Sequence, residues 1–183
     1  HSQKIKIADE SKKRVLQKNN KKVTLSKALQ IQTQSYYQKL SREGFRVLAV
    51  AQKEIQGKEN TENENNLTLL GFVAFLDPAK KDAGKILKSL KSHGVEVKVI
   101  TGDNELVTEK ICKDIGLPIK GILLGHDIDT LTDDALAIRA ENTSIFARFS
   151  PEQKNRVILA LRKQGHVVGY MGDGINDAPS LKS

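Results

Sequence analysis

An alternation of short apolar runs with amphipathic segments, from Leu67 onward, constrains the fold of this chain more than any other feature. Each apolar run is typical of a buried strand, and each amphipathic segment is typical of a helix. The strands are expected at 67–76, 95–100, 121–125, 144–149 and 166–170. The helices are expected at 80–93, at 104–115, from near Thr132 and from Ser150. Strands that alternate with helices predict an α/β fold, with a parallel sheet covered by helices on both faces.

A polar stretch at 59–66 separates this region from the N-terminal part of the chain. Its composition is too polar to pack, which is typical of a segment near a domain boundary. Before it, a helical pattern runs from Ser26 to Gly44, and an apolar run from Phe45 to Ala51 predicts a buried strand. Residues 1 to 22 are polar with weak periodicity. We therefore expect two domains, at residues 1–66 and 67–183.

Composition narrows the function classes. A hydrophobic content of 38% in 183 residues is that of a globular protein, and no apolar run is long enough to span a membrane. The formal net charge of +8 suits an acidic partner such as nucleic acid. However, aromatic residues make up only 4% and the lysines are scattered over several helices, so we expect no nucleic-acid partner. The single cysteine, Cys112, is expected to be a core thiol in a reducing compartment.

Candidate functional residues follow several of the expected strands. Thr101-Gly102-Asp103 follows one strand, Arg148 lies at the end of another, and Gly172-Asp173 follows a third. Ligands of parallel sheets gather beyond the carboxyl ends of the strands, so these loops should converge on one crevice. The Thr101 hydroxyl and the Gly102 backbone amide suit phosphate oxygens. Lys154 lies in the first turn of its helix, where the dipole disfavours a cation, which favours an anionic partner there.

Residues 172–179, Gly-Asp-Gly-Ile-Asn-Asp-Ala-Pro, carry the densest chemistry in the chain. Glycines let the backbone turn sharply, and carboxylate and amide oxygens are the hard ligands that Mg²⁺ prefers. Asp173 is the best candidate for holding Mg²⁺, while Asn176 and Asp177 would order the loop or the phosphoryl group. Such groups serve phosphoryl transfer by positioning and charge neutralisation.

Together these motifs resemble the phosphorylation domain of P-type cation-transporting ATPases, which belong to the haloacid dehalogenase-like superfamily. The segment 44–51 is similar to the family segment whose arginine contacts ATP, and Asp77-Pro78 resembles the family's hinge. The resemblance runs from about residue 26 to the end. It implies an incomplete Rossmann-like, haloacid dehalogenase-like sheet, preceded by the C-terminal part of an α+β nucleotide-binding domain. The sequences of segments 75–78, 127–131 and 165–173 resemble those of bacterial magnesium-transporting ATPases.

The resemblance implies a role for each candidate residue. ATP would be the substrate and Mg²⁺ the cofactor. The nucleotide would be contacted by Arg46, Asp103 and Arg148. The catalytic phosphate site would be formed by Thr101, Gly102, Asp103, Lys154, Asn176 and Asp177, with Lys154 on the phosphate at the nucleophile. The metal residues would be Asp173 and Asp177.

The resemblance also implies an activity for the whole protein. In the family, the ATP γ-phosphoryl group passes to an aspartate, and hydrolysis of that intermediate drives a cation across the cell membrane from the cytoplasmic face. The cation expected here is Mg²⁺, carried by membrane helices that this sequence lacks, and the partners are the remaining domains of the same pump. No Asp-Lys-Thr-Gly-Thr run, the family's nucleophile motif, occurs in the chain. We therefore expect a fragment that is inactive alone.

Two other functions remain as alternatives. A soluble phosphatase of the same superfamily needs a nucleophilic aspartate after an early apolar strand. Asp9 is the only early candidate, and the required Thr or second Asp does not stand two residues later, where Ser11 lies. A basic nucleic-acid-binding module needs aromatic platforms or a basic recognition helix, and neither is evident.

Overall fold

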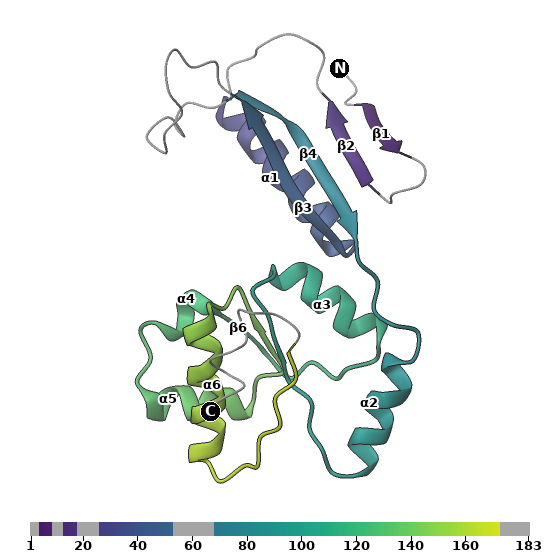
Figure 1. Ribbon diagram of the computed structural model, residues 1–183. Coiled ribbons are helices and arrows are strands. Elements are labelled where there is room, and N and C mark those ends of the chain that lie inside the picture. The colour runs from purple at the N-terminus through teal and green to yellow at the C-terminus, as the bar shows by residue number, and fades with distance from the viewer. Residues whose placement is uncertain (1–3, 9–12, 18–25, 53–67, 173–183) are drawn as a thin grey trace. The chain divides into compact units, whose positions relative to one another are not determined.

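The chain divides into two compact units, His1–Asp77 and Pro78–Ser183. Their structure comes from a computed structural model that describes residues 4–8, 13–17, 26–52 and 68–172 (Figure 1). Each unit is described by itself.

The first unit is a four-stranded antiparallel sheet in the order β1-β2-β4-β3, with helix α1 packed against β3 (Figure 1). Ser26 starts the helix as its N-cap, because its hydroxyl accepts a hydrogen bond from the Leu29 N–H at 3.3 Å. Leu40 of the helix is buried, as are Phe72 and Ala74 of β4. The elements are β1 (Lys4–Ala8), β2 (Lys13–Gln17), α1 (Lys27–Arg42), β3 (Phe45–Gln52) and β4 (Thr68–Leu76).

The boundary between the units differs from the one expected at 66/67. Strand β4 pairs with β3 from Phe45↔Leu76 to Gln52↔Thr68, and it also pairs with β2. Backbone hydrogen bonds join β4 to β2 and β3. Strand β4, which follows the polar stretch, therefore belongs to the first unit. The chain divides instead at Asp77-Pro78, the dipeptide that resembles the family's hinge.

Two other features of the first unit did not follow from the sequence pattern. Residues 1 to 22 are polar with weak periodicity, and no element was predicted there, yet they contain β1 and β2. Strand β3 forms as predicted but is not buried, since Leu48 is 56% exposed and Val50 is 40% exposed. Among the described strands, β3 is an edge strand of its sheet. An apolar run alone does not distinguish an edge strand from a central one.

The second unit contains a parallel sheet in the order β5-β7-β6, which confirms the predicted α/β fold. The strands are shorter than their apolar runs, because only a few residues of each run form backbone hydrogen bonds with a neighbouring strand. The elements are α2 (Ala83–Ser92), β5 (Val99–Ile100), α3 (Glu105–Asp114), β6 (Ile122–Leu124), α4 (Gly125–Ile128), α5 (Asp133–Glu141), β7 (Ile145–Ala147) and α6 (Pro151–Lys163).

Alternate residues of β7 divide between two hydrophobic cores, one on each face of the sheet. Phe146 packs in one core with residues of α5 and α6, including Leu136 and Val157. Ile145 packs in the other core with Cys112 of α3. Because successive side chains of a strand point to opposite faces, this division places helices on both faces, as predicted.

The strand expected at 166–170 does not form in the described structure. Val167 is fully exposed, while Val168 packs against the core that contains Phe146. A strand requires a neighbour that accepts its backbone hydrogen bonds, and none of the described strands pairs with this segment. The apolar residues therefore supply only a partial contact with the core.

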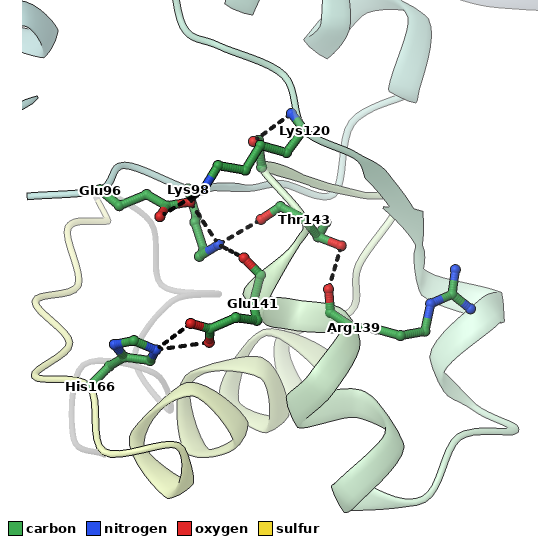
Figure 2. Close-up of polar contacts among 8 residues, drawn as sticks. Glu96, Lys98, Lys120, Arg139, Glu141, Thr143 and His166 are labelled. Carbon is green, nitrogen blue, oxygen red and sulfur yellow. Dashed lines mark hydrogen bonds and ion pairs between the residues drawn. The ribbon is translucent and has the colours of Figure 1, made fainter.

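A polar network joins the amino ends of the three parallel strands (Figure 2). Lys98, just before β5, donates to the backbone oxygens of Glu141 and Thr143, each at 2.9 Å. Lys120, just before β6, pairs with Glu96 at 3.0 Å. His166 contacts the Glu141 carboxylate at 2.8 Å. These contacts stabilise the end of the sheet at which the parallel strands begin, opposite the carboxyl ends where the candidate site lies.

Candidate functional site

The loop Thr101–Asp103 leaves the carboxyl end of β5 and is held against the neighbouring strand β7. The Thr101 N–H donates to the Phe146 oxygen at 2.8 Å, and the Phe149 N–H donates to the Thr101 oxygen at 3.0 Å. The Asp103 N–H donates to the Thr101 hydroxyl oxygen at 3.1 Å. That hydroxyl still carries its own proton, because it accepts in this bond, so it can donate to a ligand oxygen.

Arg148 lies in a strained backbone conformation at the carboxyl end of β7. Its φ is 61°, in the left-handed region that residues with a side chain rarely adopt. The conformation is fixed by the hydrogen bond from the Arg148 N–H to the Asp103 oxygen at 2.9 Å. Strain of this kind persists only where neighbours enforce it, and it is concentrated at functional sites.

A glycine makes room for this conformation. A Cβ on Gly125, the first residue of α4 directly after β6, would lie 2.4 Å from the Arg148 oxygen and 2.6 Å from the Gln153 Oε1. The carbonyl of Arg148 can therefore approach this position only because no side chain is present. Gly125 is buried, so the contact is a packed one.

The Arg148 guanidinium forms a two-point ion pair with Glu105, in the first turn of α3. Its Nε donates to Oε2 at 2.5 Å and its Nη2 donates to Oε1 at 3.3 Å. The guanidinium lowers the pKa of Glu105 below its ordinary value, mainly through this hydrogen bond. Glu105 is therefore an anion at neutral pH.

Helix α6 begins directly after this loop. Ser150 is its N-cap, Pro151 occupies its first position, and Gln153 completes a capping box. The Gln153 Nε2 also donates to the Gly125 oxygen at 3.0 Å and to the Asp129 Oδ1 at 2.6 Å. The side chain of Gln153 thus ties the start of α6 to the turn after β6.

The structure brings some of the predicted site residues together. Thr101, Gly102 and Asp103 are joined to Arg148 by the backbone bonds between their loops. Lys154 is half-buried at the end of the first turn of α6, which follows the Arg148 loop. Arg46 is an exposed residue of β3 in the first unit.

The candidate metal and phosphate residues Asp173, Asn176 and Asp177 lie outside the described residues, as does Asp9 of the alternative interpretation. Within the described ranges, no group of three or more His, Cys, Asp or Glu side chains is placed to hold a metal ion. The prediction for a metal at Asp173 and Asp177 therefore stays a prediction.

Three residues that shape the site were not predicted from the sequence. Glu105 directly follows the N-cap Asn104, and Gln153 stands three residues after Ser150, a spacing that signals a capping box. Gly125 closes the expected strand 121–125 and was given no role beyond that. Only the fold places these residues around Arg148.

A comparison with known protein families identifies the chain. Residues 2–183 match a hydrolase family described as haloacid dehalogenase-like hydrolase. The chain belongs to this family. The match agrees with the parallel sheet and with the position of the Thr101–Asp103 loop at the carboxyl end of β5.

Several curated relatives of the chain are cation-transporting ATPases. It is 48% identical over 147 residues to a magnesium-transporting ATPase, P-type 1, of Escherichia coli (strain K12), which covers 79% of this chain and 16% of the relative. It is 35% identical over 169 residues to a calcium-transporting ATPase 1 of Bacillus cereus, covering 90% of this chain and 19% of that protein. A calcium-transporting ATPase 1 of Saccharomyces cerevisiae is 36% identical over 150 residues, covering 78% of this chain and 16% of that protein.

These comparisons confirm the predicted resemblance to P-type cation-transporting ATPases and favour it over the alternatives. The chain spans only 16% of the length of the magnesium-transporting relative. Among the described residues, no helix is both long enough and apolar enough to cross a membrane.

Proposed function

We propose that this chain is part of an ATP-driven cation pump and that it supplies one side of the pump's phosphoryl-transfer site. The whole protein would transfer the ATP γ-phosphoryl group to an aspartate and use hydrolysis of that intermediate to move a cation, Mg²⁺, across the membrane. The observation that carries this proposal is the joining of Thr101–Asp103 to Arg148 at the carboxyl edge of the parallel sheet, in a chain 48% identical to a magnesium-transporting ATPase.

The described residues have the chemistry for binding a phosphate. The Thr101 hydroxyl and the Gly102 N–H would donate to phosphate oxygens, and Gly102 is exposed, so a ligand can approach its backbone. Lys154 would neutralise charge at the transferred group. Arg148 and Asp103 would contact the nucleotide. The resemblance implies nucleotide binding for Arg46 of the first unit as well, and that role stays a proposal of its own.

Mg²⁺ would be held by Asp173 and Asp177, since carboxylate oxygens are the ligands that it prefers. When bound, the ion would neutralise charge on the phosphate oxygens. Asn176 would complete the phosphate site. In this proposal the first unit is the end of the nucleotide-binding domain and the second unit is most of the phosphorylation domain, on the cytoplasmic face of the membrane.

A titration of the isotope-labelled chain with ATP and Mg²⁺, followed by NMR, tests the proposal. We expect chemical-shift changes at Thr101, Gly102 and Arg148 that depend on Mg²⁺ and that Asp173→Asn abolishes. Asp134→Asn is the matched control, because Asp134 is an exposed carboxylate on α5 that pairs with Lys163. Shift changes of equal size in both variants would contradict a metal site at Asp173.

A turnover assay separates the proposed function from the soluble phosphatase. The chain contains no Asp-Lys-Thr-Gly-Thr motif, so we expect no hydrolysis of p-nitrophenyl phosphate with Mg²⁺. Steady turnover that Asp9→Asn removes would contradict the pump interpretation and support the phosphatase.

A further inference from the structure

The ion pair between Glu105 and Arg148 joins the first turn of α3 to the loop after β7. Glu105 lies two residues after Asp103, and Arg148 lies at the end of β7. Two guanidinium nitrogens contact the two carboxylate oxygens, at 2.5 and 3.3 Å. The pair therefore orients the guanidinium plane as well as its charge.

The same edge of a guanidinium suits a phosphate. Its Nε and Nη2 hydrogens form a planar fork that matches two oxygens of a carboxylate or of a phosphate equally well. A carboxylate in that fork occupies the position that a phosphate oxygen would take. A ligand that uses this edge of Arg148 must first displace Glu105.

The backbone of Arg148 stays fixed while its side chain can exchange partners. The hydrogen bond to Asp103 and the tight contact with Gly125 hold the left-handed backbone. The side chains of Arg148 and Glu105 are 46% and 25% exposed, so a ligand in solvent can reach the pair. Breaking the pair would leave Glu105 partly exposed to water, and the lost interaction would be modest.

We propose that Glu105 is a built-in competitor for ATP at Arg148, and that its carboxylate lowers the affinity of the site for the nucleotide. This inference rests on the proposed function, because it takes ATP as the ligand of Arg148. The lowered pKa of Glu105 is consistent with it, since the competitor is charged throughout the neutral range. Glu105 thereby sets the fraction of sites that hold ATP at a given ATP concentration.

The test compares ATP affinities of the full chain and its variants by NMR titration. We expect Glu105→Gln to tighten ATP binding by about threefold to tenfold, because the amide gives up a charge-assisted pair. The matched control is Glu109→Gln, one turn later on α3, which removes the same charge from a carboxylate paired with Lys113 at 2.6 Å. The control should change affinity much less.

A double variant isolates the competition from general electrostatics. In an Arg148→Gln background, Glu105→Gln should no longer tighten ATP binding, because the group for which Glu105 competes is gone. A gain that persists in this background would overturn the inference. The inference would also be overturned if Glu105→Gln bound ATP no more tightly than Glu109→Gln, or less tightly than wild type. In that case ATP still binds, so the proposed function would stand. Failure of wild type and all variants to bind ATP would overturn both.

Discussion

Gly125→Ala is expected to destabilise the second unit severely, although it adds only one methyl group. The added Cβ would lie 2.4 Å from the Arg148 oxygen, whereas real Cβ contacts stay beyond 3.0 Å. The carbonyl of Arg148 must therefore move, and it belongs to a residue already held at a φ of 61° by a hydrogen bond to Asp103. The neighbouring Gln153 must move as well, since its Oε1 would lie 2.6 Å away.

The magnitude follows from these two displacements. Overpacking of a buried position costs about 1–3 kcal/mol. Loss of the hydrogen bond from Gln153 to the Gly125 oxygen adds about 1 kcal/mol. We expect Gly125→Ala to lower the free energy of unfolding of the second unit by about 2–4 kcal/mol.

The assay is urea unfolding followed through the NMR signals of β7, because the chain has two units and a bulk signal would mix them. Gly169→Ala is the matched control, since a Cβ there would meet no atom within 4 Å. The control should change the free energy of unfolding by less than about 0.5 kcal/mol. If Gly125→Ala were as mild as this control, the tight packing of Gly125 against Arg148 would be wrong.

Three further predictions concern the same unit. Arg156→Lys should lower the free energy of unfolding by about 1–2 kcal/mol, because a lysine cannot reproduce the guanidinium bonds to two backbone oxygens and to Asp133. Urea unfolding measures this, and an unchanged midpoint of the urea transition would contradict it. Cys112 should resist iodoacetamide in the folded chain and react on unfolding, because burial raises the pKa of its thiol to about 11; rapid labelling of the folded chain would refute the burial. Since Arg148 lowers the folded pKa of Glu105 below its ordinary 4.5, the stability from this pair should be complete above that pH and should be lost as the pH falls through the folded pKa. Arg148→Gln should reduce this acid sensitivity in urea unfolding measured at several pH values, and an identical pH profile would argue against the pair.

The sequence was sufficient to predict the elements that local patterns specify. Glycine at Gly44, Gly94 and Gly116 marks a helix end, and each adopts the positive φ that helix ends favour. The helix start at Ser150-Pro151 was also predicted correctly. The parallel sheet followed from the alternation of strands and helices, because that order leaves few other topologies.

Other features depend on which strands become neighbours, and the sequence pattern does not state this. The apolar run in β3 predicted burial, but β3 lies at the edge of its sheet among the described strands. The strand after the polar stretch joined the first unit through pairing with β3, which no local signal required. The pair between Glu105 and Arg148 joins residues far apart in the chain, so only the folded structure reveals it.

We propose that Thr101–Asp103, Arg148 and Asp173 contribute to one metal and phosphate site beyond the carboxyl ends of the parallel strands. Titration with Mn²⁺ in place of Mg²⁺ tests it most directly, because paramagnetic broadening of NMR signals falls steeply with distance from the ion. The account predicts strong broadening at Thr101–Asp103 and Arg148, little at Lys98 and Thr143 on the opposite edge, and no effect in Asp173→Asn. Equal broadening at both edges, or broadening that survives Asp173→Asn, would contradict it.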